Sequence, residues 1–186
     1  MSYKAIVIGT SAGGMEALKI LLNQLKATFR IPIIIVQHLH PEQDGFYVDY
    51  FDKICPIEVK EAEERTYICE KKIYFAPPNY HLLIENDLRF AISVDEKVSF
   101  SRPSIDVLFD SAAHVYKEKL IGIILTGANR DGAKGMVQIK KNGGLSIIQD
   151  PEEAQFKAMP RGVLDLMIPD YILQLQQIAY FLNKLT

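Results

Sequence analysis

Residues 5–25 read AIVIGTSAGGMEALKILLNQL, and this stretch decides the fold class. It opens with the apolar run 5–8, which a glycine ends, and such a run is typical of a buried strand. Apolar residues then recur at helical spacing, at Met15, Leu18, Leu22 and Leu25. The stretch therefore predicts a strand, a tight glycine-rich turn and a helix.

The same alternation continues along the chain. Apolar runs predict further strands at residues 31–36, 73–76, 120–125 and 145–148, and helical periodicity predicts helices at residues 104–115, 132–141 and 172–182. Residues 58–64 are charged and expected to be exposed, whereas residues 81–100 predict an antiparallel hairpin at the sheet edge. This order predicts one α/β domain over residues 1–186, with a doubly wound, mostly parallel sheet.

The amino-acid composition argues against several classes of function and location. The chain has 21 Lys plus Arg against 23 Asp plus Glu, so no basic field exists to hold nucleic acid. Cys55 and Cys69 form no disulfide framework, which fits a reducing compartment. No apolar stretch approaches the roughly 18 residues of a membrane span, and the N-terminus has no signal-peptide pattern, so we expect a cytoplasmic protein with no membrane insertion.

Gly9-Thr10-Ser11-Ala12-Gly13 fits G-x-S-x-G between a strand and a helix, where a tight turn exposes a serine hydroxyl as a nucleophile. The free amides at the start of the helix would face a developing oxyanion. A glycine-rich turn can equally serve only close packing or phosphate binding. The stretch lacks both the G-x-G-x-x-G spacing and the P-loop lysine, so it matches neither nucleotide signature.

His38 follows the second predicted strand, and loops at the ends of parallel strands share one crevice. Its imidazole can therefore serve as the general base for Ser11, although a loop histidine is more often structural and His40 competes for the role. The pair His38 and His40 can also begin a metal site. No third ligand is evident in the sequence, so we expect no metal.

Asp131 follows the strand at residues 120–125 and precedes a helix, so a third strand end converges on the same crevice. A carboxylate there can orient the imidazole of His38 and stabilise the imidazolium. The alternative is that Asp131 only caps its own helix. We expect one aspartate to fulfil only one of these two roles well.

Six segments of the chain resemble, in family order, the catalytic domain of the CheB-type chemotaxis protein-glutamate methylesterases. They are IVIGTSAGG, IIIVQHLHP, IYFAPPNYHLLI, SRPSIDVLFDSAA, IGIILTGANRDGAKGM and QDPEEAQFKAMPRGVL, and they span about residues 4–165. The resemblance implies that Ser11 is the nucleophile, His38 the acid and base, and Asp131 the orienting carboxylate. It further implies hydrolysis of glutamate γ-methyl esters on the cytoplasmic helices of chemoreceptors, with glutamine deamidation in some members and no cofactor.

The resemblance also places residues around this triad. Backbone amides near Ala12 and Ala128 are candidates for the oxyanion hole. Arg102, His81 and Arg161 fall in matching segments and are candidates to line the substrate crevice, although a lone arginine or histidine is more often structural.

Some features depart from the family. Its members often have Thr at the position of Ala12, Met at that of Ala128 and Gly at that of Asn129. They also usually carry an N-terminal receiver domain, which leaves the regulator of this chain unknown and the choice between a stand-alone enzyme and an excised domain open. The alternative function is therefore a catalytically weak binding module that grips a partner helix. An α/β-hydrolase would run Ser, Asp, His, so the order Ser11, His38, Asp131 disfavours it.

Overall fold

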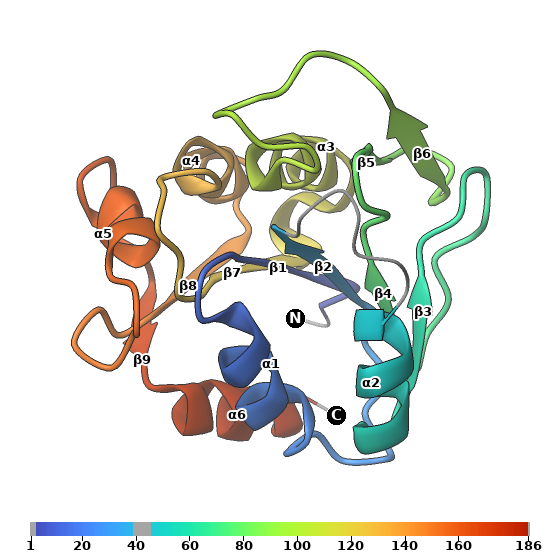
Figure 1. The fold of residues 1–186 in the computed structure, drawn as a ribbon, viewed down its shortest axis with the longest axis horizontal. Helices are drawn as coiled ribbons and strands as arrows, with labels where there is room; N and C mark the ends of the chain where they lie inside the picture. The colour runs from blue at the N-terminus through green and yellow to red at the C-terminus, as the bar shows by residue number, and fades with distance from the viewer. Residues whose placement is uncertain (1–2, 39–45, 186) are drawn as a thin grey trace.

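The computed structural model describes residues 3–38 and 46–185. A seven-stranded sheet, parallel at every strand pair, forms its centre in the order β3-β4-β2-β1-β7-β8-β9 (Figure 1). The strands of this sheet are β1 Ala5–Thr10, β2 Ile33–Gln37, β3 Glu58–Glu61, β4 Lys72–Phe75, β7 Leu120–Ile124, β8 Leu145–Gln149 and β9 Tyr171–Leu173. The predicted doubly wound α/β fold is confirmed.

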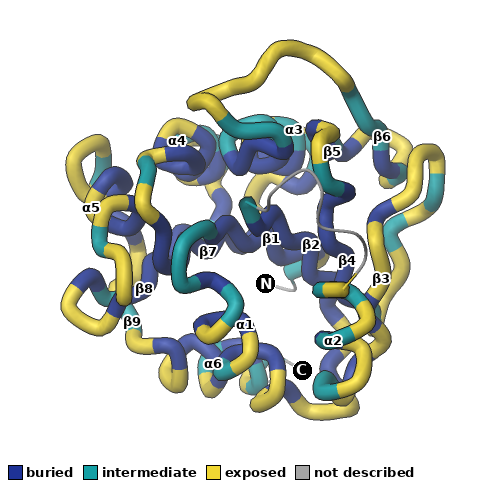
Figure 2. The backbone as a smooth tube through the Cα atoms, in the orientation of Figure 1, coloured by how far each residue is buried: buried dark blue, intermediate teal, exposed yellow. Residues whose placement is uncertain are grey.

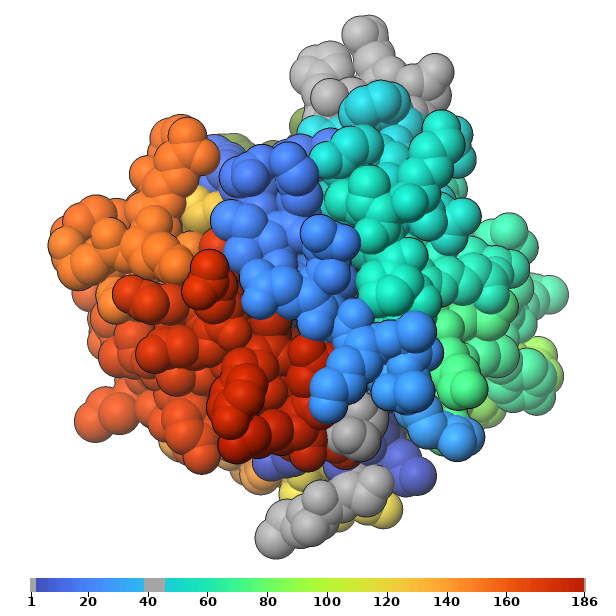
Figure 3. Space-filling view, turned by 90° about the horizontal axis from the view of Figure 1, so that it is seen from below, coloured from blue at the N-terminus to red at the C-terminus, as the bar shows by residue number. Residues whose placement is uncertain are grey.

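Helices cover both faces of the sheet. They are α1 Gly14–Leu22, α2 Phe46–Ile54, α3 Ile105–Tyr116, α4 Ala133–Lys141, α5 Ala158–Leu164 and α6 Leu175–Asn183, with a 3-10 turn η1 at Lys117–Lys119. In Figure 1, α3, α4 and α5 lie above the sheet, and α1, α6 and α2 lie below it. Seen from below, α1, α6 and α2 lie side by side and form the outer layer of that face (Figure 3).

The central strands β1, β2 and β7 are buried on both faces, as Figure 2 shows, because each face packs against a helical layer. Side chains alternate across the sheet, so neighbouring residues of β1 enter different cores. Val7 joins the core beneath α3 and α4, whereas Ile8 joins the core beneath α1 and α6. This burial makes the central strands a rigid base for the loops at their ends.

The antiparallel hairpin predicted at residues 81–100 is present as β5 His81–Ile84 and β6 Phe90–Ser93. It forms a two-stranded sheet of its own, and β5 packs against α3. The buried residues Leu82, Ile84 and Phe90 join the core beneath α3. The hairpin therefore extends the layer above the sheet and leads into the loop before α3.

Three elements differ from the sequence-based expectations. The charged stretch at Glu58 forms the edge strand β3, where Val59 is the one buried residue. Helix α5 escaped prediction because Pro160 and Gly162 are poor helix formers. The helix expected from residue 172 begins at Leu175 instead, because Gln174 and Gln177 form a capping box, and residues 171–173 pair with β8 as β9.

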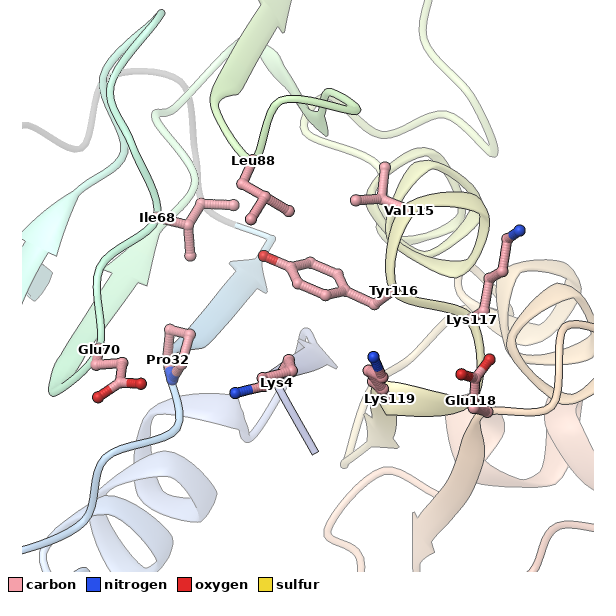
Figure 4. Close-up of a pocket in the computed structure, with 10 residues that line it drawn as sticks. All are labelled: Lys4, Pro32, Ile68, Glu70, Leu88, Val115, Tyr116, Lys117, Glu118 and Lys119. Carbon is pink, nitrogen blue, oxygen red and sulfur yellow. The ribbon is translucent and has the colours of Figure 1, made fainter. Parts of the chain in front are cut away.

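A cavity of about 560 Å³ lies where the strands of the sheet begin (Figure 4). Lys4 precedes β1, Pro32 precedes β2 and Lys119 precedes β7, and all three line it. Tyr116 also lines the cavity, and burial raises the pKa of its phenol to about 12. Ser11, His38 and Asp131 follow the other ends of β1, β2 and β7, so this cavity is remote from them.

Candidate active site

The turn between β1 and α1 presents Ser11 at the end of the central strand. Gly13 has a φ of 76°, which glycine adopts without steric cost. A Cβ on Gly14 would lie 2.0 Å from Gln37 Oε1 and 2.6 Å from Thr10 Oγ1, so a larger residue would displace these two buried side chains. The Ser11 amide donates to the Thr126 carbonyl at 3.0 Å, which ties the turn to the end of β7. Ser11 is thus held by backbone contacts and remains half-buried.

His38 lies beside Ser11 because of the register between the paired strands β1 and β2. Thr10 pairs with Gln37, so the next residue on each strand is Ser11 on one and His38 on the other. The His38 amide donates to the Thr10 carbonyl at 3.1 Å. The side chain of His38 is only 11% exposed, and its Nε2 lies 2.8 Å from Asp131 Oδ2.

Asp131 is completely buried and accepts hydrogen bonds at both carboxylate oxygens. Besides His38, it accepts from the Ser104 hydroxyl at 2.8 Å, the Ile105 amide at 2.7 Å and the Asp106 amide at 3.1 Å. The two amides belong to the first turn of α3, where unpaired N–H groups and the helix dipole favour an anion. A buried charge needs such partners to offset its lost hydration.

Asp131 does not cap its own helix, the alternative that the sequence left open, because α4 begins at Ala133 and its N-cap residue Gly132 offers no side-chain cap. The carboxylate instead contacts His38, and it has room for further donors. It also caps α3, a helix from another part of the chain, which the sequence did not predict. Capping of α3 therefore fixes the carboxylate that contacts the imidazole.

The contact also assigns the tautomer of His38. A neutral imidazole has one N–H and one acceptor nitrogen, and the ionised carboxylate accepts only. Nε2 therefore carries the hydrogen toward Asp131, which leaves Nδ1 as the basic nitrogen. In the serine-protease triad the carboxylate binds Nδ1 instead, so the imidazole of His38 is used in the reverse sense.

Buried polar residues lie directly beneath these loops, at the ends of four central strands. They are Thr10, Gln37, Thr126 and Gln149. Gln37 Nε2 donates to the carbonyls of Ser11 and His38, at 2.9 and 3.0 Å. These residues were missed from the sequence, although the signal was there: each is the polar residue that ends a run of buried apolar ones.

Thr126 joins three of the loops. Its hydroxyl donates to the Ala12 carbonyl at 2.9 Å and accepts from the Phe156 amide at 2.9 Å. Its own amide donates to Gln149 Oε1 at 2.9 Å. The turn that holds Ser11 is therefore fixed to the loops after β7 and β8.

The two proposed oxyanion donors follow the adjacent strands β1 and β7. Within the described residues, the amides of Ala12 and Ala128 donate to no backbone or side-chain acceptor. Ala12 is half-buried and Ala128 is exposed. Both amides are thus available to an external acceptor, and their role stays a prediction.

The remaining candidates hold loops together. Arg102 donates to the carbonyls of Val94 and Asp95, at 2.7 and 3.0 Å. His81 is 2% exposed; its Nδ1 accepts from the Ser104 amide at 3.2 Å, and its Nε2 contacts the Glu96 carbonyl at 3.0 Å. Arg161 pairs with the exposed Glu152. Substrate contact by these residues stays a prediction.

His40, the competing base and possible partner of a metal pair, lies outside the described residues. In the chain as described, no group of three His, Cys, Asp or Glu side chains is placed to hold a metal ion.

Comparison with known proteins decides the family. The model of the CheB methylesterase family matches residues 6–182 of this chain. The chain belongs to the CheB methylesterase family. Its fold agrees with the crystal structure of the Thermotoga maritima CheB methylesterase catalytic domain, with a TM-score of 0.94, 34% identity and complete coverage of both chains.

Two relatives of this CheB-family chain differ in length. A Leptospira interrogans protein with the provisional name protein-glutamate methylesterase/protein-glutamine glutaminase is 52% identical over 185 residues, which cover 100% of this chain and 96% of that protein. A Thermotoga maritima protein is named protein-glutamate methylesterase/protein-glutamine glutaminase. It is 34% identical to this chain over 188 residues, and the match covers 55% of that protein. This CheB-family chain is thus similar to an enzyme family that hydrolyses carboxylic esters.

Proposed function

We propose that this protein is a serine hydrolase that removes methyl groups from glutamate γ-methyl esters on the cytoplasmic helices of chemoreceptors. The observation that carries the proposal is the 2.8 Å contact between His38 Nε2 and the buried Asp131, beside a serine at the end of the adjoining strand. The names of the relatives support the ester and the glutamine amide as the substrates. The chemoreceptor as substrate and partner is inferred from the resemblance of the chain to the family.

In this mechanism Ser11 attacks the ester carbonyl while His38 Nδ1 takes the hydroxyl proton. Asp131 stabilises the imidazolium through Nε2–H and is itself held by the first turn of α3. The amides of Ala12 and Ala128 receive the oxyanion. His38 then protonates the departing methoxide, and a water that it activates hydrolyses the acyl-enzyme to release the free glutamate.

Deamidation of glutamine would use the same groups. The leaving group is then ammonia, and His38 protonates the nitrogen instead of the methoxide oxygen. Both reactions end with a glutamate carboxylate and a regenerated Ser11.

The cytoplasmic location also belongs to the proposal. None of the helices within residues 3–38 and 46–185 has the length and apolar character that a membrane span needs. The substrate helices would have to extend into the compartment of the enzyme, as the cytoplasmic portions of chemoreceptors do.

The test uses receptor cytoplasmic fragments whose glutamates carry radiolabelled methyl esters. We expect the wild-type protein to release labelled methanol and Ser11→Ala to release none, with Ser101→Ala as a matched serine control. If the wild type released no methanol from several receptor fragments while circular dichroism showed it folded, the methylesterase proposal would fail. The binding-module alternative would then predict retention of the fragments without turnover.

A further inference from the structure

The loop before α4 carries a side chain that contacts the catalytic base. Asn129 Nδ2 lies 3.4 Å from His38 Nδ1, and Asn129 Oδ1 accepts from the Asp131 amide at 3.1 Å. The second contact orients the carboxamide, because a backbone N–H can face only the oxygen. The nitrogen of the carboxamide therefore faces His38, and it can only donate.

The Asn129 N–H group faces Nδ1, the only acceptor atom of the His38 imidazole. Since Nε2–H is directed at Asp131, the single lone pair of the neutral ring is on Nδ1. The Ser11 hydroxyl needs the same lone pair to lose its proton. Among the described residues, the Nδ1 contact is with Asn129, and no hydrogen bond joins Ser11 to His38.

The contact also becomes unfavourable during the reaction. Once Nδ1 has taken the serine proton, an N–H of the imidazolium points at the N–H groups of Asn129, and two donors face each other. The carboxamide must then move away from the ring. Asn129 thus favours the resting state over the state that follows proton transfer.

We propose that Asn129 is a positioning residue that restrains the catalytic base: in the resting enzyme its carboxamide occupies His38 Nδ1, and it must withdraw before Ser11 can be activated. The proposal rests on the triad of the proposed function. Glycine, frequent at this position in the family, offers no such donor. Family members with glycine at this position would therefore lack the restraint.

Two substitutions separate the restraint from the loop contact. Asn129→Ser keeps an acceptor for the Asp131 amide, since a serine hydroxyl can bond the amide two residues on, but it is too short to reach His38. Asn129→Asp keeps the same acceptor and places a carboxylate at Nδ1, where it would hold a proton. Asn142→Ser, at the far end of α4, is the matched control.

The readout is the rate at which a fluorophosphonate labels Ser11, measured by intact mass with Ser11→Ala as the blank. We expect Asn129→Ser to be labelled roughly two- to tenfold faster than the wild type, the factor that one neutral hydrogen bond represents. Asn129→Asp should be labelled more slowly, and Asn142→Ser at the wild-type rate. Labelling of Asn129→Ser that is slower than the wild type would overturn the restraint and indicate a donor to the oxyanion instead.

A second measurement does not depend on any substrate. In ¹⁵N spectra of the histidine rings, Asn129→Ser should shift the Nδ1 resonance of His38 toward that of a nitrogen without a hydrogen bond, while Nε2 remains protonated. An unchanged Nδ1 resonance would overturn the proposal even if labelling changed. Failure of the methanol assay alone would reject the receptor substrate and leave both of these results standing.

Discussion

The hydroxyl of Ser104 donates to Asp131 Oδ1 across 2.8 Å, although Ser104 is the residue before α3 and Asp131 lies in the loop before α4. Ser104 is completely buried and does not cap its own helix with its side chain. Asp131 does so in its place. Asp131 thus takes the capping position of Ser104, and the Ser104 hydroxyl helps to hold the carboxylate that contacts His38.

The first prediction concerns Ser104→Ala. It should lower the free energy of unfolding by about 1.5 to 3 kcal/mol, the range for a hydrogen bond to a charged group. Hydrolysis should also slow, because Asp131 loses one of the donors that orient it. Urea unfolding and initial rates measure the two effects. Ser101→Ala, on the exposed loop nearby, should change neither, and equal losses in both variants would contradict the assignment.

The second prediction concerns Thr126→Val, which keeps the shape of the side chain and removes its hydroxyl. The Phe156 amide would lose its acceptor and the Ala12 carbonyl its donor at a part-buried site. A fully buried unsatisfied group costs about 1–3 kcal/mol, and because water can reach these two groups in part, we expect a total loss of stability of about 1–3 kcal/mol. Urea unfolding measures it, with Thr66→Val, whose hydroxyl is exposed, as the control.

Sequence reasoning located the main candidate residues because one rule suffices for them. Parallel strands end at a common edge, so polar residues after the runs that end near Gly9, Val36 and Leu125 had to meet there. The parallel sheet was predicted from the apolar runs, and the hairpin from a turn composition between two imperfectly alternating segments. The capping of α3 by Asp131 was not predictable, because it joins residues of separate loops whose distance depends on how α3 and α4 pack.

The short strands β3 and β9 were not predicted from the sequence, for a different reason. Strand β3 buries a single side chain, and β9 has three residues, so neither shows an alternation of apolar and polar residues that would predict a strand. The Asn129 contact with His38 and the use of Nε2 depend on side-chain rotamers, which no sequence spacing encodes. Buried Thr10 and Gln37 were readable, since a polar residue at the end of an apolar run must find a hydrogen-bond partner.

The third prediction is a pH effect at Asp170, between β8 and β9. Burial alone would raise the pKa of this carboxyl, but hydrogen bonds from Lys140 and Ser146 outweigh it and lower the pKa below its usual value. A lowered pKa stabilises the fold above the unfolded-state value of about 3.9, and this stability is lost as the pH falls through the folded-state value.

Asp170→Asn should therefore be less stable than the wild type at pH 7, and the difference should shrink as the pH falls below about 4. Thermal unfolding across this range measures it. A difference that grew toward acidic pH would contradict the assigned direction.

The fourth prediction separates the two cysteines. Burial, with the charge of Asp52 adding to it, raises the pKa of the Cys55 thiol to about 12, whereas Cys69 is exposed. The thiolate is the reactive form, so iodoacetamide at pH 8 should modify Cys69 and spare Cys55 in the folded protein. Peptide mass mapping measures it. Rapid modification of Cys55 in a folded Cys69→Ser variant would disprove the assignment.

The most direct test of the central claim, that Ser11 and His38 act as one catalytic unit, compares the methanol-release rates of Ser11→Ala, His38→Ala and the double variant. Residues that act as a unit are strongly non-additive, so the three rates should be nearly equal and far below the wild-type rate. A double variant whose loss equals the product of the two single losses would show that the residues act independently, and it would contradict the triad.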